Sequence, residues 1–470
     1  MRIEELKEKK IAILGLGVEG RALARYFLRH KIHFTIIDEK SRDNLFSLGQ
    51  EWKDDIETFE RRKIISLFEQ SLDATDLSQF DVLFRSPGIS LSRKSIQDGV
   101  QKGVTVSSQI KLFFDHCPGK IVGVTGTKGK GTTSSLIYEM LKTAGIDAYL
   151  GGNIGLAPIS FLDVLTSKSV VVLELSSFQL EDLRKSPHVA VMLMVTSEHL
   201  DDFHKQNFHK NIQEYHEAKR NILRFQTVDD MAIINTDYEA SRLSSYSTQS
   251  KVAFVSRYNP VDTGCFVRDS KIIFRDKGYE IEIIDISEIL LPGGHNLENV
   301  CSAVMAAKKL GVGDVQIQTV LRTFKGLEHR LELVREVNGV RYYDDSFSTT
   351  PETAIAAIQA FPNPEILILG GSSKGSDFTE LGKVISEIPN IKAIIGIGIE
   401  WQKIKATLRI QDLRFKIYEG VRNMKDIVAA CRELSAPGDV VLLSPACASF
   451  DMFKNYKDRG DQFKKQVNLL

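Results

Sequence analysis

Short apolar runs alternate with amphipathic stretches along almost the whole chain. Near the N-terminus, the run Ile11–Leu14 predicts a buried strand, residues 21–28 predict a helix and residues 34–37 predict a second strand. A further strand is expected from residue 81 up to a Pro-Gly turn. The last third repeats the alternation, with strands expected at 340–344, 365–369, 392–396 and 440–443 and helices at 351–360, 377–387 and 423–434. Alternating strands and helices predict an α/β fold built on doubly wound sheets.

The middle of the chain carries apolar runs that are typical of fully buried strands. Residues 170–175, 189–195 and 231–234 are almost wholly apolar, which favours parallel strands covered on both faces. Residues 251–291 are rich in β-branched side chains and turn signals, which predicts a small antiparallel patch. A long helix is expected over 297–310. We expect boundaries near residues 108 and 326, which divide the chain into Rossmann-like domains at 1–108 and 327–470 around a central ATP-binding domain at 109–326.

Composition fits a globular protein and excludes some partners. The 470 residues are too many for one core, and 61 basic residues balance 61 acidic ones, so no basic field favours nucleic acid or anionic membranes. No apolar run is long enough to span a bilayer, and the first residues do not resemble a signal peptide. The five cysteines show no regular spacing, which favours reduced thiols. We expect a cytoplasmic monomer that acts on small molecules.

The most distinctive motif is a turn rich in glycine and lysine. Residues 123–133 read Gly-Val-Thr-Gly-Thr-Lys-Gly-Lys-Gly-Thr-Thr, between an apolar run and a helical pattern. In such a turn, backbone N–H groups and the helix dipole converge on an anion, and a lysine adds charge for the terminal phosphates. The spacing differs from a strict Walker A motif, because Gly123 and Gly129 are one residue too far apart and Gly131 stands where Ser or Thr is usual. The motif predicts binding and cleavage of ATP, with Thr132 as the hydroxyl that holds Mg²⁺.

A second glycine pattern lies near the N-terminus. Gly15, Gly17 and Gly20 form a GxGxxG motif between a strand and a helix, and Asp38 ends the next strand. By itself this pattern would suit a nicotinamide dehydrogenase. That alternative leaves the lysine-rich turn unexplained.

Polar residues that end buried runs suggest a metal site. Glu174 lies at the end of an apolar run, and His199 and Asp201 follow the next one. Taken alone, Glu174 could equally well be a buried, hydrogen-bonded carboxylate, and His199 could equally well be a solvated histidine on a loop. Because the carboxyl ends of parallel strands meet at one sheet edge, their presence beside a phosphate loop favours metal ligation.

A series of short motifs resembles the Mur ligase family over the whole chain. They are Gly-Thr-Lys-Gly-Lys at 126–130, Gly-Gly-Asn-Ile-Gly at 151–155, Leu-Glu-Leu-Ser-Ser-Phe-Gln at 173–179, Glu-His-Leu-Asp at 198–201, Tyr-His-Glu-Ala-Lys at 215–219, Gly-His-Asn-Leu-Glu-Asn at 294–299, Gly-Leu-Glu-His-Arg at 326–330 and Leu-Ser-Pro-Ala-Cys-Ala-Ser-Phe-Asp at 443–451. The resemblance implies an ATP- and Mg²⁺-dependent ligase that adds glutamate to UDP-N-acetylmuramoyl-L-alanine through an acyl phosphate. Such a reaction belongs to peptidoglycan precursor synthesis, and hence to cell wall formation and cell division.

The resemblance also implies a role for individual residues. Residues implied to bind ATP are Gly126, Thr127, Lys128, Gly129, Lys130, Gly131, Thr132, Asn299, Arg330 and Asp345. Those implied to bind the UDP-sugar are Gly15, Gly17, Gly20, Asp38 and Asn153, and those for glutamate are Thr349, Lys374, Ser449 and Tyr456. Thr132, Glu174, His199 and Lys219 match metal-site positions, with Lys219 at the place of the family's carbamylated lysine. Lys130, His199, Lys219 and Arg330 are the implied catalytic residues.

The chain departs from the family pattern at several places. Gly131 stands at the place of the usual hydroxyl residue, which is similar to folylpolyglutamate synthase, a relative. Residues 203–210 form an insertion. Phe347 and the pair Thr350-Pro351 replace a lysine and an asparagine that the family commonly has beside the amino-acid site. D-glutamate is the expected substrate, and the L-glutamate-adding variant of the ligase is the alternative. More remote alternatives are a folylpolyglutamate synthase-like ligase, a dehydrogenase and a non-catalytic nucleotide-sugar sensor.

Overall fold

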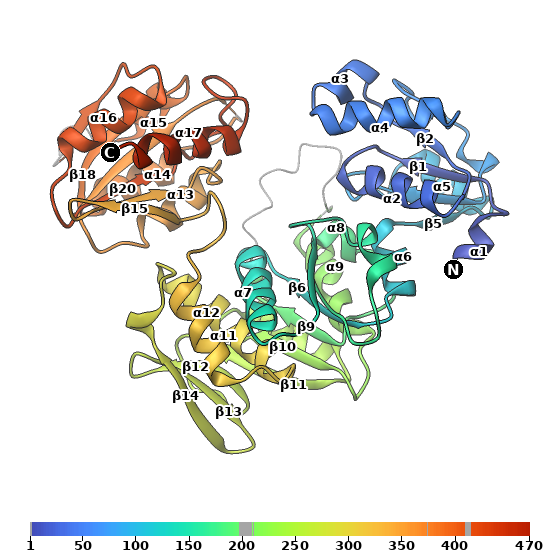
Figure 1. Cartoon of the computed structure of the whole chain (residues 1–470), viewed down its shortest axis with the longest axis horizontal. Helices are drawn as coiled ribbons and strands as arrows, with labels where there is room; N and C mark the ends of the chain where they lie inside the picture. The colour runs from blue at the N-terminus through green and yellow to red at the C-terminus, as the bar shows by residue number, and fades with distance from the viewer. Residues whose placement is uncertain (1, 197–208, 210, 374, 409–414) are drawn as a thin grey trace. The chain divides into compact units, whose positions relative to one another are not determined.

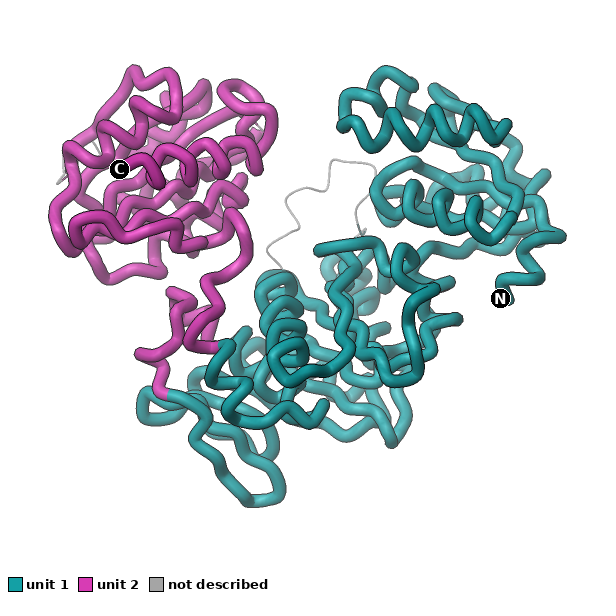
Figure 2. The backbone as a smooth tube through the Cα atoms, in the orientation of Figure 1, with its two compact units in different colours: residues 1–284, 298–320 teal, residues 285–297, 321–470 magenta. Residues whose placement is uncertain are grey.

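The computed structural model describes residues 2–196, 209, 211–373, 375–408 and 415–470. The chain forms two compact units (Figure 2). Unit 1 comprises residues 1–284 and 298–320, and unit 2 comprises residues 285–297 and 321–470. The described strands form three separate sheets (Figure 1). The expectation of three α/β domains is therefore confirmed, and the boundaries at 108 and 326 stay a prediction.

The N-terminal sheet has five parallel strands in the order β3-β2-β1-β4-β5. They are β1 (Ile11–Leu14), β2 (Thr35–Ile37), β3 (Ile65–Leu67), β4 (Val82–Arg85) and β5 (Thr105–Ser107). The accompanying helices are α1 (Ile3–Leu6), α2 (Val18–Arg29), α3 (Arg42–Phe46), α4 (Gln50–Arg61) and α5 (Lys94–Gln101). This strand order places the turn between β1 and α2 at a topological switch point, where open α/β sheets bind ligands.

The central sheet has nine strands in the order β14-β13-β12-β11-β10-β9-β6-β8-β7. They are β6 (Lys120–Thr125), β7 (Ala148–Gly152), β8 (Val170–Glu174), β9 (Val189–Met192), β10 (Met231–Asn235), β11 (Lys251–Ser256), β12 (Gly264–Arg268), β13 (Lys271–Asp276) and β14 (Tyr279–Asp285). The helices along this part of the chain are α6 (Gln109–His116), α7 (Lys130–Thr143), α8 (Ser177–Leu180), α9 (Ile212–Arg224), α10 (Glu239–Leu243), α11 (Gly294–Lys309) and α12 (Asp314–Thr323). The helix expected from residue 297 thus begins three residues earlier.

The expected antiparallel patch over 251–291 needs a correction. Strand β11 pairs in parallel with β10, and β12 pairs in parallel with β11, so both extend the main sheet. Antiparallel pairing begins only between β12 and β13. The β-branched composition predicted strands correctly, but composition carries no information on which strands pair or in which direction.

One end of this sheet is the edge strand β14, which carries charged side chains. Glu280 pairs with Arg268 at 2.6 Å and also with Arg275, and Glu282 pairs with Lys271 at 2.6 Å. Both arginines and the lysine lie on the neighbouring strands β12 and β13. The outermost strand is therefore bound to its neighbours by ion pairs between side chains.

The C-terminal sheet has six strands in the order β15-β16-β20-β17-β18-β19. They are β15 (Glu332–Val337), β16 (Val340–Asp344), β17 (Glu365–Gly370), β18 (Ile391–Ile397), β19 (Lys416–Tyr418) and β20 (Val440–Leu443). Its helices are α13 (Pro351–Ile358), α14 (Thr379–Glu387), α15 (Trp401–Thr407), α16 (Met424–Leu434) and α17 (Tyr456–Asn468). The predicted strands and helices of this region are confirmed within a few residues. The edge strands β15 and β19 and the helices α15 and α17 were not predicted, and β15 runs antiparallel to β16.

Buried apolar side chains lie on both faces of the C-terminal sheet, which fits its near-continuous apolar strands. Among the described residues, no helix is both long and apolar enough to cross a membrane.

Candidate active site

The turn between β6 and α7 is shaped by glycines. Gly126 and Gly129 have φ values of 158° and 86°, which L side chains rarely adopt. A Cβ on Gly126 would lie 2.8 Å from Leu193 Cβ, and one on Gly129 would lie 2.2 Å from Asn299 Oδ1. The turn therefore needs glycine at both positions. It also lies against Asn299, which the motifs place at the ATP site.

Two lysines converge on this turn. Lys130, the first residue of α7, donates from Nζ to the carbonyl oxygens of Gly126 and Thr127, both at 3.1 Å. Lys219 on α9 donates from Nζ to the same Gly126 carbonyl at 2.8 Å. The structure thus brings together two predicted catalytic residues that are 89 positions apart in the sequence.

The environment of Lys219 is unusual for a lysine. Its side chain is almost completely buried, and Nζ lies 4.5 Å from the centre of the Tyr215 ring. Burial lowers the pKa of Lys219 well below its usual value, and the charge of Lys130 lowers it further, while Glu174 acts in the opposite direction. The Tyr215 hydroxyl lies 3.0 Å from Thr127 Oγ1, so Tyr215 links the lysine to the turn. Tyr215 was missed as a functional residue, although it lies in one of the matched motifs.

Glu174 ends strand β8 at the same sheet edge as the turn. Strand β8 is parallel to β6, with Glu174 paired with Val124. The Glu174 side chain is 7% exposed, and its Oε1 accepts a hydrogen bond from Asn153 Nδ2 at 3.2 Å. Asn153, implied as a UDP-sugar residue, therefore contacts the predicted metal ligand. Thr132 is buried in the first turn of α7. The predicted ligand His199, with Asp201, lies outside the described residues.

The N-terminal glycine turn has the geometry of a close-approach site. Gly15 has a φ of 82°, and a Cβ on Gly20 would lie 2.0 Å from the Gly15 carbonyl oxygen. A Cβ on Gly17 would meet nothing within 4 Å. Asp38 accepts hydrogen bonds from the backbone N–H groups of Leu16 at 2.6 Å and Lys40 at 2.8 Å. Asp38 thus holds the backbone of this turn.

Side chains connect this N-terminal turn with the central domain. Gln179 Nε2 donates to Glu19 Oε1 at 2.5 Å. Arg85, at the end of β4, donates to Glu181 Oε1 at 2.5 Å and to the Phe178 carbonyl at 3.1 Å. Burial raises the pKa of Glu181 to about 7, against the opposing effect of Arg85. Because these partners lie just after β8, the two candidate ligand sites of unit 1 share a hydrogen-bonded connection.

In unit 2, Arg330 lies on a loop with an uncommon backbone. Its neighbours His329 and Leu331 have φ values of 61° and 45°. His329 Nδ1 lies 2.7 Å from Asp344 Oδ2, and Leu331 N donates to Asp345 Oδ1 at 3.1 Å. These contacts hold the chain on both sides of Arg330. Its guanidinium carbon lies 5.2 Å from the centre of the Phe347 ring.

Asp345, implied as an ATP residue, is engaged within the protein. It is 2% exposed, and its Oδ2 accepts hydrogen bonds from the Ser348 hydroxyl and from the Ser444 hydroxyl, the latter at 2.7 Å. Burial raises its pKa to about 7, despite these hydrogen bonds and the charge of Arg330. Through its hydrogen bond from Leu331 N, Asp345 supports the loop that carries Arg330.

The residues implied to bind glutamate lie at the ends of neighbouring strands. Thr349 follows β16, Ser449 follows β20 and is buried, and Tyr456 begins α17. The Phe347 ring stands edge-on to the Tyr456 ring at 5.2 Å. Lys374 lies outside the described residues.

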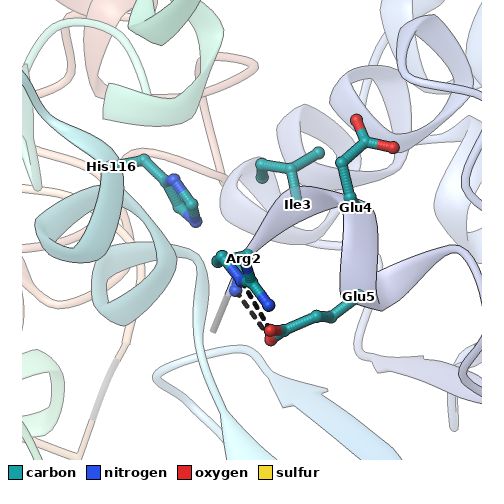
Figure 3. Close-up of a pocket in the computed structure, with 5 residues that line it drawn as sticks. All are labelled: Arg2, Ile3, Glu4, Glu5 and His116. Carbon is teal, nitrogen blue, oxygen red and sulfur yellow. Dashed lines mark hydrogen bonds and ion pairs between the residues drawn. The ribbon is translucent and has the colours of Figure 1, made fainter.

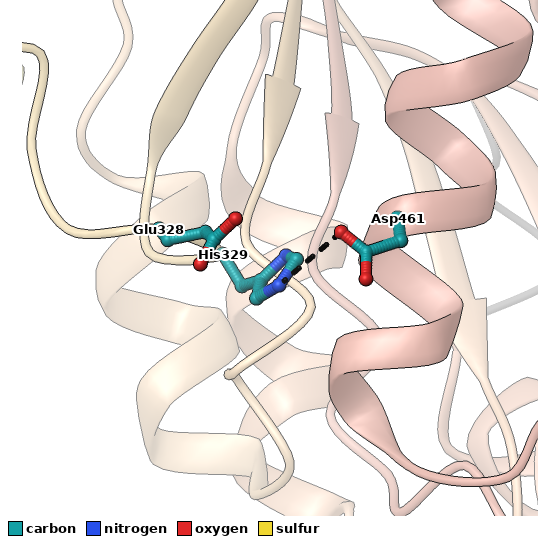
Figure 4. Close-up of side chains that lie close together, drawn as sticks. All are labelled: Glu328, His329 and Asp461. Atoms are coloured by element: carbon teal, nitrogen blue, oxygen red, sulfur yellow. Dashed lines mark ion pairs between the residues drawn. The ribbon is translucent and has the colours of Figure 1, made fainter.

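Side chains around His329 have the spacing of metal ligands, but a lysine already balances the charge of their carboxylates. Glu328, His329 and Asp461 lie close together, with His329 Nε2 3.8 Å from Asp461 Oδ1 (Figure 4). Lys464 Nζ lies 2.7 Å from Glu328 and 3.6 Å from Asp461, so an ammonium group supplies the cation. We assign this group as an ion-pair network.

A cavity of about 490 Å³ lies beside helix α1. It is lined by Arg2, Ile3, Glu4, Glu5 and His116, and Arg2 donates to Glu5 at 2.7 Å (Figure 3). No residue of the predicted sites lines it. We therefore assign the candidate active site to the turns at the strand ends and not to this cavity.

Comparisons with known proteins identify all three parts of the chain. Three family models match successive parts of the chain: the Mur ligase MurD-like N-terminal domain at residues 9–108, the Mur ligase middle domain at 124–307 and the Mur ligase glutamate ligase domain at 329–447. The UDP-N-acetylmuramoylalanine–D-glutamate ligase of Acetivibrio thermocellus is 39% identical, over 99% of this chain and 98% of that protein. The enzyme of the same name from Symbiobacterium thermophilum is 37% identical, over 98% of each chain.

Solved structures share the fold at lower identity. The UDP-N-acetylmuramate-alanine ligase MurC of Thermotoga maritima aligns with a TM-score of 0.59 and 15% identity, over 98% of this chain and 100% of that one. The MurF ligase of the same organism, solved in complex with ADP, aligns with a TM-score of 0.57 and 18% identity, over 100% and 97%. Matches to all three domains, and relatives above 30% identity over nearly the full length, show that this chain belongs to the Mur ligase family.

Proposed function

We propose that this protein is an ATP-dependent ligase that joins D-glutamate to UDP-N-acetylmuramoyl-L-alanine. The observation that carries the proposal is the convergence of Lys130 and Lys219 on the Gly126 carbonyl, at the sheet edge where Glu174 ends β8. A phosphate loop with two lysines and a carboxylate suits phosphoryl transfer. The substrates come from the names of relatives that match the chain over nearly its full length.

The proposed reaction has two steps. The terminal carboxylate of the UDP-sugar attacks the γ-phosphorus of ATP, which forms an acyl phosphate and releases ADP. The amine of glutamate then attacks the acyl carbon, loses a proton and expels phosphate, which leaves an amide. Lys130 would stabilise charge on the transferring phosphoryl group, and Arg330 would do the same from the C-terminal domain.

The residues present fit a hard divalent cation. The donors are the Thr132 hydroxyl and the Glu174 carboxylate, with His199 as a further candidate. Oxygen ligands are those that Mg²⁺ prefers, and bound Mg²⁺ neutralises phosphate charge. A buried ammonium on Lys219 would oppose such a cation.

Carbamylation of Lys219 would remove this conflict. Only the neutral amine reacts with CO₂, and burial together with Lys130 favours that form. The carbamate would be an anionic oxygen donor on α9, beside the turn. Among the described residues, the hydrogen-bond acceptor of Lys219 Nζ is a backbone carbonyl and not a carboxylate, which would suit an amine that becomes a carbamate.

The other sites follow the strand ends. Gly15, Gly17 and Gly20 would hold the pyrophosphate of the UDP-sugar at the N-terminus of α2, with Asp38 fixing the turn. Asn153 would orient Glu174 and contact the sugar. Asn299, Arg330 and Asp345 would serve ATP, the last by supporting the Arg330 loop. Thr349, Lys374, Ser449 and Tyr456 would bind glutamate.

Whether the substrate is D-glutamate or L-glutamate is a separate question about the same site. The relatives named above are D-glutamate ligases, which favours the D enantiomer. The Phe347 ring, beside Arg330 and Tyr456, forms a wall that differs from the family's common lysine. Comparing kcat/KM for the two enantiomers decides between them, since a polar pocket that loses its hydrogen bonds discriminates strongly. A preference for L-glutamate would overturn the D assignment and leave the reaction class intact.

One assay tests the reaction against its rivals. The purified protein is incubated with ATP, Mg²⁺, UDP-N-acetylmuramoyl-L-alanine and D-glutamate, while phosphate release and the mass of the product are followed. We expect phosphate and amide in equal amounts, and no phosphate when either co-substrate is omitted. Binding without turnover would favour a sensor, and a change in NAD(P)H absorbance would favour a dehydrogenase.

A further inference from the structure

Arg459 carries an almost fully enclosed charge. Its side chain, on helix α17, is 0% exposed. Among the described residues, no carboxylate lies within ion-pair distance of its guanidinium. Buried charges are normally paired, because removing an ion from water is costly. Burial lowers the pKa of Arg459 to about 10, so the group remains charged at neutral pH.

The guanidinium binds the backbone of two loops instead. Nη2 donates to the Ser346 carbonyl at 2.9 Å, and Nε lies 2.9 Å from Ser346 Oγ. Nη2 also donates to the Cys447 carbonyl at 3.1 Å, and Nη1 donates to the Ala448 carbonyl at 3.3 Å. The first loop follows β16 and the second follows β20, so one side chain joins the carboxyl ends of two adjacent strands.

A third strand end packs against the same group. A Cβ on Gly371, directly after β17, would lie 2.1 Å from the Ala448 carbonyl and 3.3 Å from Arg459 Nη1. Ser346 Oγ also donates to the Tyr456 carbonyl at 2.7 Å, which ties the first loop to the start of α17. Arg459 therefore lies beneath the meeting point of β16, β20 and β17.

These loops carry the residues proposed for glutamate. Thr349 lies three positions after Ser346, and Ser449 directly follows Ala448. The five donors of a guanidinium form a rigid fork, which a lysine ammonium does not reproduce. Asp344, Asp345 and Asp451 raise the pKa of Arg459, so its charge is partly offset within the protein, and its role is to hold the loops.

We propose that Arg459 is a positioning residue for the amino-acid substrate, which sets the spacing of the loops after β16 and β20. The inference rests on the proposed function of those loops. It assigns to Arg459 no contact with substrate.

The test compares Arg459→Lys and Arg459→Gln by steady-state kinetics with glutamate and ATP varied separately. Arg459→Lys keeps the charge but loses the fork, and we expect the KM for glutamate to rise at least about 10-fold. Arg459→Gln loses both and should raise it further. The KM for ATP should stay within about twofold in each variant. Arg432→Lys, the same change at an exposed position on α16, is the matched control and should behave like the wild type.

Each result supports or overturns the proposal. A merely structural role would lower kcat through loss of folded enzyme, or raise both KM values together, and either outcome overturns it. An unchanged glutamate KM in Arg459→Lys overturns the positioning role. If circular dichroism shows that neither variant folds, Ser346→Ala decides, since it removes only the hydroxyl that accepts from Arg459 Nε and donates to the Tyr456 carbonyl. We expect a selective rise of about 2- to 5-fold in its glutamate KM, and no rise would refute the idea. Absence of ligase activity in the wild type would instead refute the proposed function.

Discussion

At the residue scale, the side chain with the clearest chemical role is Lys130. Its Nζ donates to two carbonyls of the turn between β6 and α7, which we propose to be the phosphate loop. We predict that Lys130→Ala lowers kcat at least about 100-fold, because a charge-stabilising donor is lost in the transition state. Lys142→Ala, at an exposed position of the same helix, should leave kcat unchanged. Phosphate release measures both. Substantial turnover by Lys130→Ala would contradict the assignment.

Lys219 supplies a second prediction at this scale. If it acts as a carbamate, the wild-type enzyme incubated with ¹³C-bicarbonate should show a carbamate carbon signal by NMR. Lys219→Arg should lack the signal and most activity, because a guanidinium stays protonated and does not react with CO₂. Arg220 is the neighbouring basic residue, and Arg220→Lys should keep the signal. Full activity of Lys219→Arg would exclude the carbamate.

Glu365 gives a prediction about stability that is independent of the active site. It is 0% exposed at the start of β17, and burial raises its pKa from 4.5 to about 8, with a hydrogen bond from Asn390 acting the other way. Between these two pH values, the carboxyl group is thus neutral in the folded state and ionised in the unfolded state. Stability should therefore fall as pH rises from about 4.5 to about 8.

The matching variant is Glu365→Gln, which cannot ionise. Its free energy of unfolding relative to the wild type should increase by about 2 kcal/mol or more between pH 5 and pH 8. Urea unfolding followed by the fluorescence of Trp401, with both proteins carrying Trp52→Phe so that only unit 2 contributes, measures the difference. A difference that does not vary with pH would show that Glu365 is ionised in the folded protein.

At the scale of elements, the turn between β6 and α7 depends on its backbone. Gly129→Ala would combine a φ of 86° with a contact of 2.2 Å to Asn299 Oδ1. Gly145→Ala, after the end of α7, combines a φ of 73° with open space and is the control for strain alone. We predict that Gly145→Ala costs about 1 kcal/mol of stability and leaves the KM for ATP unchanged. Gly129→Ala should also raise the KM for ATP, and equal kinetics of the two variants would count against the contact.

The loop that presents Arg330 gives another prediction at the scale of elements. Asp345 supports this loop through Leu331 N and two serine hydroxyls. Asp345→Asn keeps an oxygen acceptor for Leu331 N, so kcat/KM for ATP should fall less than about 10-fold. Asp345→Ala leaves these donors unpaired and should cost considerably more. Equal losses in both variants would mean that the negative charge itself acts on ATP.

At the scale of the whole molecule, the sequence predicted the three α/β domains and most strands, because buried parallel strands produce long apolar runs. It also predicted the glycine turn between β6 and α7, since its glycines are close together in the chain. The contact of Lys219 with Gly126 joins residues 93 positions apart, and only the family resemblance indicated it. Arg459 was missed, because a basic residue on a polar helix such as α17 usually faces solvent. Whether β12 and β13 run parallel or antiparallel to the strands beside them depends on which strands pair, and the hydrophobic pattern does not encode this.

The charged edge of the central sheet has a consequence for the behaviour of the protein in solution. An edge strand exposes backbone donors and acceptors that can pair with another molecule, and charged side chains oppose this. Glu280 lies between Arg268 and Arg275, whose hydrogen bonds lower its pKa to about 2. It should therefore remain ionised in mildly acidic medium, where most exposed carboxylates begin to lose their charge. Intermolecular β-sheet formation on acidification should accordingly begin at other strands, and β14 should be among the last segments of this sheet to aggregate.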